Sequence, residues 1–311
     1  MTTNFQRQWN AAKGSESRRS DFLKTQIARA NAFLLSCGPP GKSLLEGFRA
    51  AGTIETIDNP ASLPDGSTPP ACFNTFRNSG FANEMTYDLN SATDFPSFFE
   101  IRVHEMVHAI QYNSFPILHA SITNPFSPVS CRRHEHARIE NITEMTAHAV
   151  QAYMSGMLAL KEPKAYSDPN VAARITKRTR TFQKQYNNDT SVILNELALM
   201  IRRDYGEFYS FKARSDFYRS AELRNRHGLP PLFFIKPTEQ EIYDLGNMFI
   251  GGHLRKGIEP DHGADTACNE TPSLETYLAA NNLTPIEFME QSRNQPPIVP
   301  PTGSNPVPSP S

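Results

Sequence analysis

The chain has 311 residues, of which 38% are hydrophobic, and a net charge of −1 at neutral pH. This length suits one globular domain of ordinary to large size or two small ones, and the balanced charge gives no sign of nucleic-acid binding. No apolar run approaches the roughly 18 residues of a membrane span. The N-terminus lacks the apolar core of a signal peptide, so we expect a cytoplasmic protein, or alternatively a bacterial effector secreted without a signal peptide.

The four cysteines are scattered along the chain and form no CxxC pair. They are Cys37, Cys72, Cys131 and Cys268. This spacing argues against a disulfide scaffold and against a thiolate zinc site. We interpret the cysteines as isolated small hydrophobic residues.

The N-terminal part contains two predicted helices. Residues 1–20 are polar, without clear apolar periodicity, and are predicted to form a flexible leader. Apolar residues then recur at helical spacing over 21–36 and 43–51. The Gly-Lys-Ser between these helices does not complete a phosphate-binding loop, because Ser36 stands where that motif needs glycine, and two prolines lack N–H donors. We interpret the segment as a turn between helices.

Three short segments with strand character follow. They cover residues 53–57, 71–76 and 84–90, and predict a small antiparallel sheet. In a zinc peptidase such a sheet can offer an edge strand to an extended peptide. A purely structural sheet is an equally good interpretation.

The most informative stretch is His104-Glu105-Met106-Val107-His108. Histidines four residues apart lie on one helix face, so both can reach one zinc ion at about 2.0–2.1 Å. Glu105 lies one position round the helix, where its carboxylate can take a proton from a water that the metal has acidified to a pKa of about 7.

The surrounding residues predict a largely buried helix. Many positions over 98–110 are apolar, and Asp94 or Thr93 before Pro96 is typical of a helix start. A buried helix needs a reason to carry two histidines and a glutamate. We therefore predict a zinc site.

A catalytic zinc needs a third protein ligand. The three-histidine motif that extends HExxH is excluded, because Gln111 and Ser114 occupy its glycine and histidine positions. A predicted helix over 137–161 offers Glu140 and Glu144 on one face, and one can bind the metal while the other holds a histidine N–H. We favour Glu144, because small residues follow it. Glu140 remains the alternative, and two solvated carboxylates are also possible.

Other histidines and tyrosines receive weaker predictions. The sequence His134-Glu135-His136 is predicted to lie in an exposed loop before the 137–161 helix, with an added ligand or a second metal as the alternative. His253 and Tyr243 are candidate donors to the oxyanion of amide hydrolysis. Neither is selected by spacing.

Two further segments complete the chain. A helix over 171–186 carries five basic residues between 174 and 184, which either bind an acidic partner or form a solvated face. The last 21 residues, 291–311, contain 7 prolines and are predicted to be an extended or disordered tail.

The order of these motifs resembles that of the gluzincins, the zinc peptidases that combine HExxH with a glutamate. It is more closely similar to an uncharacterised metallopeptidase-like domain family of bacteria, over roughly residues 22–255. The matching residues are Pro40-Gly41-Lys42-Ser43-Leu44-Leu45, Leu89-Asn90, His104-Glu105-Met106-Val107-His108-Ala109-Ile110-Gln111 and Glu144-Met145-Thr146-Ala147-His148-Ala149. Only the HExxH part is specific.

This resemblance implies an α+β, mostly helical, zincin-like domain over 21–290, with a small sheet before the HExxH helix. It implies one zinc ion bound by His104, His108 and Glu144. The third ligand stays open, because Met145 replaces an alanine of the bacterial pattern. The segment from Glu140 to Glu144 also has the shape of the E-N-I-x-D segment of neprilysin-like peptidases, which would make Glu140 the ligand.

The predicted function is hydrolysis of peptide bonds in a peptide or protein substrate, with Glu105 as the general base. A zinc hydrolase of a non-peptide amide is one alternative. A second alternative is an interaction protein that keeps the zincin fold but turns over little or no substrate.

Overall fold

A computed structural model describes a large part of the chain: residues 3–57, 71–77, 80–115, 117–118, 129–131, 133–185, 233–238, 240–241, 244–245, 279 and 282. Its elements, in order, are α1 (Asn4–Ala12), α2 (Glu16–Ser36), α3 (Pro39–Ala51), β1 (Ile54–Ile57), β2 (Ala71–Arg77), β3 (Gly80–Tyr87), α4 (Phe95–Ser114), β4 (Val129–Cys131), α6 (Arg133–Lys161), the 3-10 turn η1 (Pro163–Ala165), α7 (Pro169–Gln185) and β5 (Phe233–Ile235). Helices predominate and a small sheet precedes α4, which confirms the α+β, mostly helical prediction.

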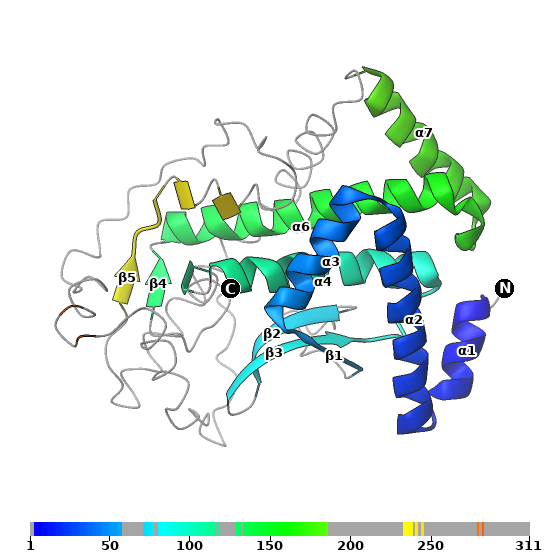
Figure 1. Cartoon of the computed structure of the whole chain (residues 1–311), viewed down its shortest axis with the longest axis horizontal. Helices are drawn as coiled ribbons and strands as arrows, with labels where there is room; N and C mark the ends of the chain where they lie inside the picture. Colours follow the sequence, from blue (N-terminus) through cyan, green and yellow to red (C-terminus); the bar gives the residue numbers. More distant parts are fainter. Residues whose placement is uncertain are drawn as a thin grey trace, which may run out of the picture.

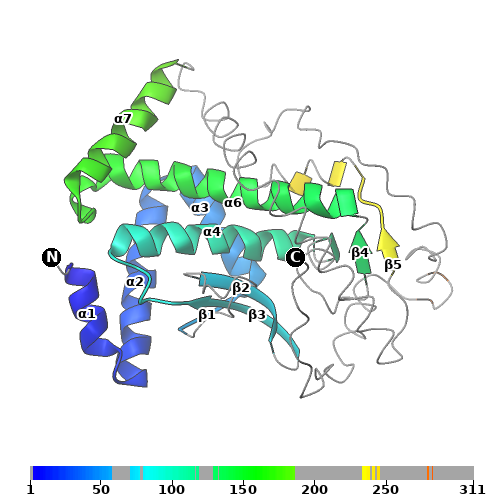
Figure 2. The same ribbon diagram turned by 180° about the vertical axis from the view of Figure 1, so that it is seen from behind.

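Helix α4, which carries the HExxH sequence, lies between α6 and the sheet formed by β1, β2 and β3 (Figures 1 and 2). Thirteen of its 20 residues are buried, as predicted for a helix covered on more than one side. Asp94 is the N-cap, and its side chain accepts a hydrogen bond from the Ser97 N–H at 3.0 Å. Helix α6 runs antiparallel to α4 and packs alongside it (Figures 1 and 2).

The sheet is mixed rather than antiparallel, which corrects the sequence prediction. Its strand order is β1-β3-β2, with β3 parallel to β1 and antiparallel to β2. Alternation of apolar and polar residues identifies a strand, but it carries no information on the direction of the neighbouring strand. The antiparallel prediction was therefore wrong for one of the two strand pairs.

A buried ion pair joins α4 to this sheet. The guanidinium of Arg102 is 1% exposed and donates two hydrogen bonds to Glu55 of β1, at 2.7 and 3.0 Å. The Tyr87 O–H of β3 donates to the same carboxylate at 2.6 Å. Burial, and then the charge of Glu55, raise the pKa of Tyr87 well above its usual value, so it remains a donor.

The first helix corrects the prediction of a flexible leader over residues 1–20. Phe5 and Trp9 are four residues apart, both are 6% exposed, and both pack against Phe22 of α2 with ring centroids 5.1 and 5.8 Å away. The Trp9 indole N–H donates to Asn90 at 3.0 Å. Two large buried aromatic rings stabilise this short helix, although most of its other residues are polar.

The predicted turn between the two helices is confined to Cys37 and Gly38, and the Gly-Lys-Ser segment lies inside α3, which corrects the helix start predicted at residue 43. Helix α3 already begins at Pro39, because proline suits the first turn of a helix. Gly38 makes the turn with a φ of +74°, and Gly41 packs so closely on α2 that a Cβ would lie 2.0 Å from the carbonyl oxygen of Leu34. Both glycines have structural reasons to be there.

Helix α6 begins earlier than predicted and includes the sequence His134-Glu135-His136. The loop prediction for these residues was wrong, because Glu135, Ile139 and Thr143 are all buried and lie four residues apart, so they continue one helix face. Strand β4 before α6 pairs in parallel with β5, a contact that the sequence analysis did not predict.

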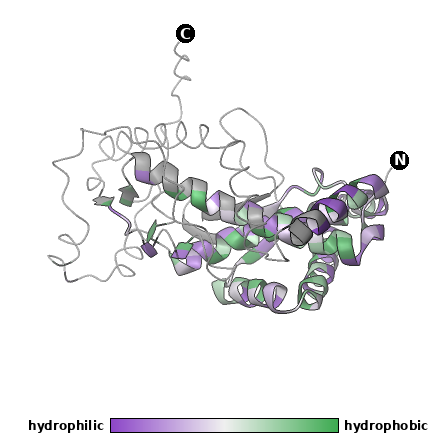
Figure 3. Cartoon of the chain, turned by 90° about the horizontal axis from the view of Figure 1, so that it is seen from above, coloured by the Kyte–Doolittle hydropathy of each residue, from purple (hydrophilic) through white to green (hydrophobic). Residues whose placement is uncertain are grey.

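The remaining predictions on the fold have mixed outcomes. The basic helix is confirmed as α7, which packs near the end of α6 (Figure 1). Hydrophobic and hydrophilic residues are interleaved along the helices, as expected for helices that bury one face (Figure 3).

No helix in the described ranges is long and apolar enough to cross a membrane. The tail over 291–311 lies outside the described residues.

Candidate metal centre

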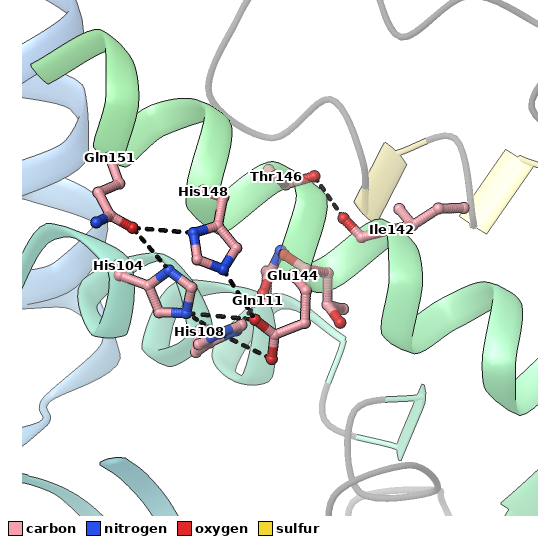
Figure 4. A network of polar contacts seen from close by, with 9 residues as sticks. His104, His108, Gln111, Ile142, Glu144, Thr146, His148 and Gln151 are labelled. Atoms are coloured by element: carbon pink, nitrogen blue, oxygen red, sulfur yellow. Dashed lines mark hydrogen bonds and ion pairs between the residues drawn. The ribbon is translucent and has the colours of Figure 1, made fainter. Parts of the chain in front are cut away.

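Three side chains from α4 and α6 bring their ligand atoms together (Figure 4). The Nε2 atoms of His104 and His108 lie 3.0 Å apart. One carboxylate oxygen of Glu144 lies 3.3 Å from His104 Nε2, and the other lies 3.5 Å from His108 Nε2. The predicted set of two histidines and Glu144 is therefore gathered in one place, and all its ligand atoms lie within 4.8 Å of one another.

Gln111 determines how the ring of His108 presents its nitrogens. The Gln111 NH₂ group donates to the backbone carbonyl of Thr143 at 3.1 Å, so its oxygen faces the other way and accepts from His108 Nδ1–H at 3.0 Å. A neutral imidazole with its proton on Nδ1 has a lone pair on Nε2. When His108 is neutral, it therefore directs a metal-binding lone pair at Glu144 and His104.

Gln151 orients the ring of His104 in the same way, by accepting a hydrogen bond from it. Its oxygen lies 3.2 Å from His104 Nδ1, and an amide oxygen only accepts, so the proton of His104 is on Nδ1. Donation of the other ring N–H to a fixed acceptor is the usual way in which proteins orient a metal-binding histidine. Gln111 and Gln151 thus orient one histidine each.

The resulting arrangement needs a positive charge at its centre. Two lone pairs that face each other at 3.0 Å, beside a carboxylate, repel one another unless a proton or a metal ion lies between them. Atoms that bind one tetrahedral zinc ion at about 2.0–2.1 Å lie roughly 3.3 Å apart. The three separations, 3.0, 3.3 and 3.5 Å, match this spacing.

The pKa values respond to the same electrostatics. Burial lowers the pKa of His108, but the Glu144 carboxylate outweighs it and raises that pKa to about 9. Burial raises the pKa of Glu144, but His108 and His104 hold it well below its usual value. Glu144 is therefore ionised at neutral pH and ready to bind a cation, which competes with a proton for His108.

Glu105 lies next to His104 on α4 and is half-buried. Its charge helps to raise the pKa of both His108 and Tyr87, so its carboxylate is close enough to both to act on them electrostatically. The residue predicted to be the general base therefore adjoins the predicted ligands.

The structure also shows three residues near the centre that the sequence analysis did not assign: Gln111, His148 and Gln151. His148 follows Glu144 by four residues, and its Nε2 lies 4.0 Å from a Glu144 oxygen. Burial, and then the charge of His104, lower the pKa of His148 to about 4, so it is neutral. The four-residue spacing from Glu144 was a signal that could have identified His148 from the sequence.

The other candidate residues lie outside the described part of the chain. They are Tyr243, His253 and the side chains of Glu140, His134 and His136. The backbone of Glu140 is one turn before Glu144 on α6. Its alternative role as third ligand stays a prediction.

Comparisons with protein family models, with curated proteins and with solved structures find no match to this chain. The gluzincin resemblance therefore depends on the residues and their spacing alone.

Proposed function

We propose that this protein is a zinc-dependent metallopeptidase that binds one zinc ion through His104, His108 and Glu144. The observation that carries the proposal is the convergence of two imidazole lone pairs and an ionised carboxylate from two helices, at the mutual spacing of zinc ligands. Two nitrogens and one carboxylate also form a common ligand set of catalytic zinc, which leaves a position for water.

Zinc is favoured over harder cations by the chemistry of the donors. Imidazole nitrogens suit zinc and other transition metals, whereas magnesium and calcium prefer sites made of oxygen atoms. Both histidines are held by glutamine acceptors, and α4 is anchored to the sheet by Arg102, so the ligand atoms are oriented before a metal binds.

The expected chemistry is amide hydrolysis. A zinc ion held by His104, His108 and Glu144 would polarise the scissile carbonyl and acidify the attacking water. Glu105, a half-buried carboxylate next to His104 in the sequence, would accept the proton of this water and return it to the leaving amine. The substrate is a peptide or protein.

The first test is the metal content of purified full-length protein by elemental analysis. We expect about one zinc per chain in the wild type, and its loss in His104→Ala and Glu144→Ala. Glu140→Ala should keep its zinc. Loss of zinc in Glu140→Ala, with retention in Glu144→Ala, would exchange the roles of the two glutamates. A folded wild type that takes up no zinc would refute the proposal.

The second test is cleavage of peptide libraries and unfolded proteins. Glu105→Gln should keep its zinc while cleavage falls by about 10²–10⁴-fold, because only the proton acceptor is removed. A zinc-loaded wild type that hydrolyses only small amides would instead indicate the non-peptide amidase. Zinc-loaded protein that hydrolyses neither would indicate an interaction protein.

A further inference from the structure

A polar cavity of about 540 Å³ lies at the start of α4, away from the metal centre. It is lined by the start of α1, the middle of α2, the start of α4 and the chain around η1. Helix α1 and the start of α4 lie at the same end of the molecule (Figures 1 and 2). His104 follows Phe95, which lines the cavity, by roughly 14 Å along the helix axis. The cavity has the volume of a small-molecule site and is separate from the metal centre.

Gln26 of α2 is the residue that points to a ligand. It lines the cavity and is only 6% exposed. Its side-chain amide can donate two hydrogen bonds and accept others, yet it makes none with any residue of the described ranges. A buried amide without a partner costs free energy, so proteins nearly always satisfy such groups. The partner of Gln26 must therefore come from the cavity.

The charges around the cavity select an anion. Arg29 and Lys164 line it, and Asp94 is the one carboxylate among its described lining residues. Both oxygens of Asp94 are already engaged, because one accepts hydrogen bonds from Ser97 and the other from Ser167. Lys164 forms no ion pair within the described part of the chain. The cavity thus has an excess of positive charge.

Arg29 is held so that most of its N–H groups stay available. Its guanidinium lies over the ring of Phe95, with Cζ 3.7 Å from the ring centroid. One of its nitrogens pairs with Glu162 at 3.4 Å, and the other two have no acceptor among the described residues. A guanidinium that stacks on a ring presents its N–H edge, which matches the oxygens of a phosphate or a carboxylate.

The start of α1 adds further donors. The first N–H groups of a helix have no partner within the helix, and this end carries a partial positive charge. Thr3 satisfies the N–H of Gln6, whereas those of Asn4 and Phe5 have no acceptor in the described ranges. Asn4 and Phe5 both line the cavity. Helix N-termini are common binding sites for phosphate.

We propose that this cavity binds a small molecule through a phosphate group. The amide of Gln26, the side chains of Arg29 and Lys164 and the first N–H groups of α1 supply more donors than the two oxygens of a carboxylate need. They suit the three terminal oxygens of a phosphate. The inference does not depend on zinc or on peptidase activity, because none of these groups belongs to the metal centre.

The test is titration calorimetry of the full-length protein with inorganic phosphate at low salt. We expect one saturable site. Gln26→Leu and Arg29→Met should each weaken binding by about tenfold or more, because each removes hydrogen bonds to a charged group. Lys164→Met should weaken it as well. The matched control is Lys24→Met, which removes an exposed lysine of α2 outside the cavity and should bind like the wild type.

Two further titrations separate this cavity from other binding. A zinc chelator should leave phosphate binding unchanged, because the metal centre is not involved. Acetate should bind about tenfold more weakly than phosphate or worse, because it offers fewer oxygens to the same donors.

A wild type that binds no phosphate up to about 10 mM would overturn the inference, whether or not any variant folds. Equal weakening by Lys164→Met and Lys24→Met would also overturn it, because that result indicates unspecific charge attraction. Loss of binding with the chelator would place the phosphate on a metal ion instead. Acetate that binds as tightly as phosphate would refute the assignment to a phosphate group.

Discussion

Helix α4 carries charged or polar clusters on two faces, and the two clusters differ in their electrostatics. Toward the sheet, Arg102 and Glu55 have opposite charges, and two short hydrogen bonds join them. Toward α6, His104, His108 and Glu144 direct lone pairs at one another. The first cluster is complementary as it stands and serves the fold. The second cluster is stabilised only when a proton or a metal ion lies between its donor atoms, and this difference separates a structural cluster from a candidate binding site.

The largest expected effect comes from breaking the complementary cluster. Arg102→Met should lower the free energy of unfolding by about 3–5 kcal/mol, because Glu55 is left as a partly buried charge without its partner. Denaturant unfolding measures this loss.

The surface pair formed by Lys42 and Glu46 gives a matched control for this prediction. Its side chains are 65% and 61% exposed, so Lys42→Met should change stability by less than about 1 kcal/mol. Pairing Arg102→Met with Glu55→Leu should recover much of the loss. Equal effects of Arg102→Met and Lys42→Met would show that the buried pair contributes no more than a surface pair.

The α6-facing cluster should respond to metal and the sheet-facing cluster should not. Zinc at about a thousandfold excess over its dissociation constant should stabilise the wild type by about 4 kcal/mol, because it binds the folded state. Thermal unfolding with and without zinc measures this stabilisation. Glu144→Gln should abolish the stabilisation by zinc. A Glu144→Gln variant stabilised as much as the wild type would place the metal elsewhere.

Loss of an orienting glutamine should weaken this cluster without removing a ligand. Gln111→Leu should reduce zinc affinity about 10–100-fold, because the Nδ1–H of His108 loses its acceptor and the ring is no longer held. Chelator competition gives the affinity. An unchanged affinity in Gln111→Leu would show that the ring is held by packing rather than by this hydrogen bond.

Proton competition should make zinc binding depend on pH. The pKa of His108 is raised to about 9, so His108 is protonated at neutral pH and must lose its proton to bind zinc. Apparent affinity should therefore rise with pH by up to about tenfold per unit and level off above about pH 9. Titration calorimetry in buffers of different ionisation enthalpy should detect a released proton. Affinity independent of pH between 6 and 8 would contradict this.

The smallest expected effect lies at the start of α4. Asp94→Ala should cost about 1 kcal/mol, because the helix loses its cap and Ser167 loses a hydrogen-bond acceptor at 2.6 Å. Burial raises the pKa of Asp94, but hydrogen bonds from Ser167 and Ser97 outweigh it and lower the pKa.

The sign of the pH dependence at Asp94 follows from this lowered pKa. Asp94 stabilises the fold above its unfolded pKa of about 3.8, and this stabilisation is lost as the pH falls through the lower folded value. Acid unfolding of the wild type and Asp94→Ala should therefore converge at low pH. A difference that persists below both pKa values would assign the effect to packing.

Much of the centre could be predicted from the sequence, because spacing along a helix determines which side chains share a face. The pair His104 and His108 follows from this rule, and so does the choice between Glu140 and Glu144, of which the structure brings Glu144 to the histidines. The sequence analysis predicted Asp94 or Thr93 at the start of α4, and the structure has Asp94 as the N-cap. The first helix was missed although Phe5 and Trp9 are four residues apart, because two aromatic anchors are a weak signal in a polar segment.

The sequence by itself determined the helices of the centre and the chemical types of its donors, since both are properties of residues close together along the chain. Only the tertiary structure decided how those donors are oriented. Gln151 is 47 residues from His104, and the two meet because α4 and α6 pack antiparallel. The sequence also did not determine that β1 pairs in parallel with β3. Contacts between distant segments depend on how whole elements pack, which local periodicity does not encode.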